Sequence, residues 1–187
     1  IMYRALTKVI LLLGIMNSFF LWGQTQVGSF ELENLERDYR FYVSNNYDEN
    51  KAHALVINIH GFGSNAAQQE FYSGFNNVCD TADCIVVYPN GIENAWNAGF
   101  IDPPPNDVLF IATLIDTISA QYNIDLSRIY STGMSMGGFM SYKLACELTN
   151  QFAAIASVTG SMANSLENSC VPSQPIPIMQ IHGTDDD

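Results

Sequence analysis

The sequence predicts an α/β fold in which a parallel β-sheet is covered by helices on both faces. Apolar runs typical of strands alternate along the chain with segments whose apolar residues have helical spacing. Several of the strand segments are apolar on both faces, as in sheets that are buried on each side. With 187 residues, 48% of them hydrophobic, the chain has enough apolar material for one domain with a core. We therefore expect a three-layer α/β/α sandwich.

The expected strands are short runs rich in branched and aromatic residues, at 38–43, 54–60, 84–88, 128–132, 152–158 and 176–181. The expected helices carry an apolar stripe and cover residues 66–78, 107–122 and 136–148. Asp107 is suited to cap the second of these helices. Residues 94–106, which include three consecutive prolines at 103–105, are expected to form an irregular surface excursion.

The first two dozen residues have the pattern of a signal peptide. Arg4 and Lys8 precede an apolar core at residues 9–16, and a polar stretch follows Gly23. A permanent membrane anchor is the alternative, but a spanning helix needs about 20 consecutive apolar residues and this run is interrupted at residues 17–18. We predict a signal peptide over residues 1–24, a domain over residues 25–187, secretion to the extracellular or periplasmic space, and no permanent membrane span after cleavage.

The charge of the chain excludes one class of partner. Seven basic and nineteen acidic residues give a formal net charge of -12. Such a surface repels polyanions, so nucleic acid is not expected as a partner. The charge is typical of a protein that must stay soluble outside the cell.

Export would place the four cysteines where disulfides persist. The simplest pairing joins Cys79 to Cys84 and Cys146 to Cys170, although four cysteines permit three connectivities. None of them has the spacing of a zinc site, and no metal is expected.

The segment from Gly133 to Gly137 carries the main chemical signal. It matches G-x-S-x-G, the nucleophile elbow of α/β-hydrolases, in which a tight strand-to-helix turn exposes a serine hydroxyl. A strand-like run precedes it and a helical pattern follows it. The glycines have a physical reason to be small, because the turn is strained and the helix packs close to the strand. We therefore predict that Ser135 is a nucleophile.

A serine nucleophile needs donors for the oxyanion and a base for its proton. In this fold the donors are the N–H of the residue after the nucleophile, here Met136, and an N–H from the loop after an earlier strand. The glycine-containing loop at residues 60–63 suits the second role, and we assign that donor to Phe62; an ordinary glycine turn is the alternative. This chemistry requires no metal or organic cofactor.

The acid and the base should follow the serine in the order serine, acid, histidine. Carboxylates are available in residues 185–187, but no histidine follows them. His53, His60 and His182 each lie beside a predicted strand and are expected to be structural. Both ends of the chain look cut, so we expect a domain that is incomplete at its C-terminus, with a catalytic histidine beyond residue 187. The 187-residue chain is then expected to be inactive or nearly so.

Several segments of the chain resemble one family. Residues 55–65, 95–100, 107–110, 122–146 and 179–186 are similar to the polyhydroxybutyrate depolymerase and feruloyl or acetylxylan esterase group of secreted α/β-hydrolases, carbohydrate esterase family 1 and its relatives. The resemblance implies that the acid is the last residue of H-G-T-x-D, which is Asp186. It also implies the Cys146–Cys170 disulfide. By the same resemblance Trp96 lines the acyl pocket, with a place in the core as the alternative.

The resulting hypothesis is a secreted serine esterase that forms an acyl-enzyme on a carboxylic ester. Its substrate would be polymeric or polysaccharide-linked: a polyhydroxyalkanoate-type polyester, or a feruloyl or acetyl ester of a plant polysaccharide. An acyltransferase or a serine peptidase on the same fold, and a polymer-binding protein without activity, are the alternatives.

Overall fold

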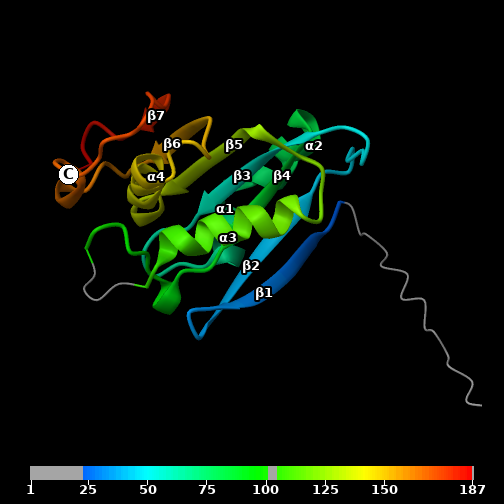
Figure 1. The fold of residues 1–187 in the computed structure, drawn as a ribbon, viewed down its shortest axis with the longest axis horizontal. Helices are drawn as coiled ribbons and strands as arrows, with labels where there is room; N and C mark the ends of the chain where they lie inside the picture. The colour runs from blue at the N-terminus through cyan, green and yellow to red at the C-terminus, as the bar shows by residue number, and fades with distance from the viewer. Residues whose placement is uncertain (1–22, 101–104, 187) are drawn as a thin grey trace, which may run out of the picture.

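The computed structural model describes residues 23–100 and 105–186 (Figure 1). They form one seven-stranded sheet in the order β1-β2-β4-β3-β5-β6-β7. Apart from Gly23 and Gln24, the predicted signal peptide at residues 1–24 lies outside the described residues. Within the two described ranges, no helix is both long and apolar enough to cross a membrane.

The strands are β1 Thr25–Leu32, β2 Leu35–Val43, β3 His53–Ile59, β4 Cys84–Pro89, β5 Ile124–Met134, β6 Ala154–Val158 and β7 Ile178–Ile181. Strands β4, β3, β5, β6 and β7 pair in parallel. The sheet is nevertheless mixed, because β1 and β2 form an antiparallel hairpin that pairs with β4 through β2. The prediction missed β1, which has little apolar character. Its place is set by the tight turn at Glu33 and Asn34, both with positive φ, as in the hairpin turns that match strand twist.

The helices are α1 Ala66–Ser73, α2 Phe75–Ala82, α3 Asp107–Ser119 and α4 Met136–Glu147, with short 3-10 turns at Ile92–Asn94 and Asn164–Leu166. The larger apolar cluster joins α3 and α4 to one face of the sheet, and the smaller joins α1 and α2 to the other (Figure 1). The three-layer sandwich is thus confirmed. A single helix over 66–78 is wrong, because Gly74 has a φ of 58° and ends α1 where α2 begins.

Strand β3 shows why the central strands are mostly apolar. All seven of its residues are buried. Leu55, Ile57 and Ile59 belong to the cluster under α3 and α4, whereas Ala54 and Val56 belong to the cluster under α1 and α2. Successive side chains point to opposite faces of a strand, so covering both faces favours apolar residues at consecutive positions.

The expectation of a surface excursion over 94–106 is wrong for its first part. Ala95, Trp96 and Ala98 are buried. A buried ion pair holds this segment in place, since Asp107 Oδ1 accepts from Arg37 Nη2 at 2.7 Å and Asp107 Oδ2 accepts from the Asn97 N–H at 2.6 Å. The loop is therefore anchored to α3 and β2 through a carboxylate that also binds Arg37, 70 residues away along the chain.

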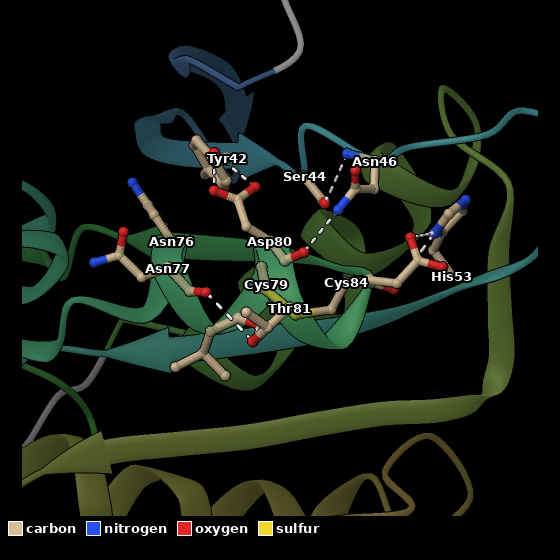
Figure 2. Close-up of a disulfide and its surroundings, with 12 residues drawn as sticks. Tyr42, Ser44, Asn46, His53, Asn76, Asn77, Cys79, Asp80, Thr81 and Cys84 are labelled. Carbon is tan, nitrogen blue, oxygen red and sulfur yellow. Dashed lines mark hydrogen bonds and ion pairs between the residues drawn. A yellow bond between two sulfur atoms is a disulfide. The ribbon is translucent and has the colours of Figure 1, made fainter.

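Two disulfides lie at the ends of helices. Cys79 in α2 is bonded to Cys84 at the start of β4, as Figure 2 shows, with Cα atoms 4.6 Å apart. Cys146 in α4 is bonded to Cys170, with Cα atoms 4.9 Å apart. These are the two pairs that the sequence analysis favoured.

Polar contacts surround the first disulfide (Figure 2). Tyr42 Oη donates to the carboxylate of Asp80, at 2.9 Å to each oxygen. Burial, assisted by this carboxylate, raises the pKa of Tyr42 to about 12. On the other side of the disulfide, His53 Nδ1 lies 2.9 Å from Asp83 Oδ1. These contacts hold the end of α2 against β2 and β3.

We expect the Cys146→Ala/Cys170→Ala double variant to lose about 3 kcal/mol of unfolding free energy, because this disulfide closes a loop with a sequence separation of 24 residues. Urea unfolding followed by circular dichroism measures the loss. The Cys79→Ala/Cys84→Ala variant is the matched control: it opens a loop with a separation of only 5 and should lose less. Equal losses, or a larger loss in the control, would contradict the loop-length argument.

Candidate active site

The candidate residues lie at one edge of the sheet. Because β3, β5, β6 and β7 run in parallel, their carboxyl ends share an edge, and the loops that follow them lie side by side (Figure 1). The pairing at this edge is Ile59 with Gly133, Met134 with Val158 and Val158 with Ile181. The next residues along the chain are the 60–63 loop, Ser135, and the segment from His182 to Asp186.

Ser135 occupies the bend between β5 and α4. Its φ of 52° and ψ of -118° lie in a region that residues other than glycine rarely adopt, at a cost of about 1–3 kcal/mol. The bend is held by hydrogen bonds, since the Ser135 N–H donates to the Val158 carbonyl at 2.8 Å and its own carbonyl accepts from the Gly138 N–H at 2.8 Å. The residue itself is exposed. The strained turn therefore places the hydroxyl at the surface of the sheet edge.

The glycines of the motif permit close packing behind this turn. A Cβ atom on Gly137 would lie 2.1 Å from the Ile59 carbonyl oxygen, and one on Gly133 would lie 2.5 Å from the Gly137 carbonyl carbon. No side chain fits at either position. The start of α4 thus packs directly on the backbone of β3 and β5.

Gly160 is a residue of this site that the sequence analysis missed. A Cβ atom there would lie 2.6 Å from the Ser135 carbonyl oxygen. Its signal in the sequence is weak, since it is a single glycine shortly after an apolar strand.

The 60–63 loop lies beside the serine. A Cβ atom on Gly61 would be 3.6 Å from Ser135 Cβ, an ordinary contact distance. The loop is tied down by the Gly63 N–H, which donates to the Asn94 carbonyl at 2.8 Å. No acceptor for the Phe62 N–H is found among the described residues, and the Phe62 side chain is 71% exposed. Met136 is the first residue of α4, a position whose N–H has no partner within the helix.

Trp96 is fully buried, which contradicts the expectation that it lines the acyl pocket and supports a place in the core. Its indole Nε1 donates to the His60 carbonyl at 2.9 Å, and the two rings have centroids 4.9 Å apart. The ring lies under the 60–63 loop because the segment 95–98 is drawn inward by the buried Asp107.

The three histidines have different surroundings. His53, at the amino end of β3, is paired with Asp83. His60 is buried, and burial lowers its pKa from 6.5, an effect opposed by the Gly61 hydrogen bond and the charge of Asp107. His182 lies after β7, with Nε2 3.5 Å from Asp186 Oδ2.

Asp186 lies after β7, which is separated from β5 in the sheet by the single strand β6. With neighbouring strands about 4.8 Å apart, the ends of β5 and β7 are separated by roughly 10 Å. This leaves room for an imidazole between a serine on one loop and a carboxylate on the other. Asp186 is 42% exposed, and its N–H donates to the Gly183 carbonyl at 3.3 Å. Asp187 lies outside the described residues.

One cavity lies between the β1–β2 hairpin and the residues around Gly91. It has a volume of about 500 Å³ and is lined by Asn65, Gly91 and Asn94 together with residues of β1 and β2. Ser135 is not among its lining residues. In residues 23–100 and 105–186, no group of three or more His, Cys, Asp or Glu side chains is arranged to hold a metal ion.

Known proteins share this architecture. Residues 106–187 match the model of a family described as Phospholipase/Carboxylesterase. The solved structure of a thermostable esterase superposes with a TM-score of 0.72 at 25% sequence identity, covering 87% of this chain and 47% of the other. The sheet order and the strained elbow agree with this likeness. The chain has the α/β-hydrolase fold.

This chain has relatives that are esterases by name. It is 33% identical over 137 residues to the putative esterase NocK of Nocardia uniformis subsp. tsuyamanensis, covering 71% of this chain and 40% of that protein. It is 29% identical over 153 residues to a bifunctional acetylxylan esterase/xylanase of Neocallimastix patriciarum, covering 81% of this chain and 22% of that protein. It is 32% identical over 157 residues to a probable feruloyl esterase C of Aspergillus flavus, covering 81% of this chain and 55% of that protein. The chain thus spans about half, or less, of the length of these relatives.

Proposed function

We propose that the protein hydrolyses carboxylic esters through an acyl-enzyme formed on Ser135. The observation that carries this proposal is the exposed serine at a positive-φ bend, directly beside the Gly61–Phe62 loop. In this mechanism the hydroxyl attacks the ester carbonyl while the N–H groups of Phe62 and Met136 bind the oxyanion. The alcohol leaves, and water then releases the acid. No metal or organic cofactor takes part in these steps.

The base in this proposal is a histidine outside residues 1–187. His53 and His60 have both ring nitrogens engaged by neighbouring groups, which argues against either one taking the serine proton. The relatives are longer than this chain, which is consistent with a base supplied elsewhere. Asp186 would hold that histidine in the correct tautomer and stabilise its cation without itself being protonated.

We assign the substrate to esters linked to a polymer. The names of two relatives support a feruloyl or acetyl ester of a plant polysaccharide, and the sequence resemblance also includes enzymes that cut polyhydroxyalkanoate-type polyesters. Secretion is part of the proposal, supported by the two disulfides, which persist in oxidising compartments. The net charge of -12 argues against nucleic acid as a partner.

Covalent labelling of the full-length protein tests the proposal. A fluorophosphonate probe should label one peptide, which mass spectrometry should identify as the one containing Ser135. Methyl ferulate and 4-nitrophenyl acetate should be hydrolysed in water without an added acceptor. Labelling at another residue would overturn the assignment of the nucleophile. Turnover that requires an added alcohol would favour an acyltransferase instead.

A further inference from the structure

We propose that His60 is a positioning residue that sets the direction of the Phe62 N–H through the carbonyl of Gly61. This inference rests on the proposed function, in which that N–H binds the oxyanion. The inference is based on two hydrogen bonds of the imidazole and on the planarity of the peptide unit between Gly61 and Phe62.

The hydrogen bonds determine where the imidazole carries its proton. His60 Nε2 accepts from the Gly91 N–H at 3.0 Å, so this nitrogen bears no proton. Nδ1 must then carry the proton of the neutral ring, and it lies 2.7 Å from the Gly61 carbonyl oxygen. The ring therefore accepts from one loop and donates to the other.

The Gly61 carbonyl and the Phe62 N–H belong to the same peptide unit. In a planar trans peptide the C=O and N–H bonds point in opposite directions, so a bond that holds the carbonyl also holds the N–H. The Ser64 N–H donates to the same carbonyl at 3.1 Å. Rotation of this peptide would turn the N–H away from the developing oxyanion and bring a carbonyl oxygen toward it, which would repel the negative charge.

This peptide needs such a restraint because glycines flank the Phe62 position. Gly61 and Gly63 have more backbone freedom than other residues, and Gly63 has a φ of 73°. The imidazole can restrain them because it is itself fixed. It is fully buried against Trp96, whose Nε1 donates to the His60 carbonyl, and Trp96 is followed by Asn97, which is bound to the buried Asp107.

Burial also keeps the imidazole in the form that makes both bonds. It lowers the pKa of His60, which favours the neutral ring. A protonated ring would have two donors and would lose the bond from the Gly91 N–H. The nearby carboxylate of Asp107 and the Gly61 carbonyl act in the opposite direction on this pKa.

Two amide substitutions separate the donor from the acceptor. The amide of asparagine reaches the place of Nδ1, and that of glutamine reaches the place of Nε2. His60→Asn can therefore donate to the Gly61 carbonyl, whereas His60→Gln can only replace the acceptor for Gly91. In the full-length protein we expect His60→Gln to lower kcat by about 10- to 100-fold with little change in KM, because a donor that acts mainly in the transition state is misdirected. We expect His60→Asn to retain more of the activity.

The rate of labelling by the fluorophosphonate should fall in parallel with kcat, because phosphonylation also develops charge on an oxygen in the oxyanion hole. The matched control is His53, at the other end of β3, which is also buried and hydrogen-bonded. His53→Asn and His53→Gln should both reduce the free energy of unfolding, and the two variants should have similar kcat values. A folded His60→Gln variant that is as active as His60→Asn overturns the inference. A wild-type protein that is neither labelled nor active would instead reject the proposed function, and this inference with it.

Discussion

Ser135→Ala is expected to lower kcat/KM for a 4-nitrophenyl ester by about 10⁵- to 10⁶-fold in the full-length protein, because it removes the atom that forms the acyl-enzyme. A small activity above the uncatalysed rate should remain, since the oxyanion donors still bind the substrate carbonyl. Stability should change little, because the residue is exposed and its backbone bonds involve no side-chain atom. Stopped assays with concentrated enzyme, together with thermal unfolding, measure both quantities.

Ser157→Ala provides the matched control for this variant. Ser157 lies on β6 near the same edge, but its hydroxyl is buried and has no hydrogen-bond partner among the described residues. Removing it should leave turnover unchanged and should not destabilise the protein. Substantial turnover by Ser135→Ala, with labelling retained, would show that the nucleophile lies elsewhere.

Asp186→Asn is expected to lower kcat by about 10⁴-fold with little change in KM. An amide cannot stabilise the imidazolium, and its N–H₂ group favours the wrong tautomer of the catalytic histidine. The neighbouring Asp185→Asn variant is the matched control, since it removes the same charge one position earlier. It should retain activity close to that of the wild type. The opposite ranking of the two variants would show that the resemblance places the acid at the wrong residue.

The pair of Asp186 with His182 allows a second test. If the base lies outside residues 1–187, His182→Asn should keep most of the activity of the full-length protein, because His182 only contacts the acid from within the same loop. Loss of turnover in this variant comparable to that of Ser135→Ala would instead identify His182 as the base.

The 187-residue chain alone should show no ester hydrolysis, and robust hydrolysis by it would also contradict an external base.

The central strands and the elbow could be predicted because their signals are local. The run at β3 is apolar from Ala54 to Ile57 because both faces of the sheet are covered, and residues 133–137 carry the glycines that a close strand-to-helix packing demands. The sequence also indicated both disulfide pairs, one by proximity and the other by family resemblance.

Other features escaped prediction because they depend on contacts with another element of the fold. Strand β1 has a weak pattern of its own and is defined by its pairing with β2. Trp96 could equally have lined a pocket or filled the core, and its burial depends on Asp107, which is bound in turn to Arg37, 70 residues away along the chain. Periodicity reports which face of an element is buried, but not which residue from another element lies against it.

By itself, the sequence determined the layered α/β architecture, the position of the exposed serine and the carboxylates available near it, because these depend on short patterns of side-chain polarity and backbone freedom. Only the tertiary structure decided that His60 joins the loop of Gly91 to the peptide between Gly61 and Phe62, with Trp96 beneath. The physical reason is that a hydrogen bond between loops depends on how the parallel strands bring their carboxyl ends together, and that arrangement exists only in the folded sheet.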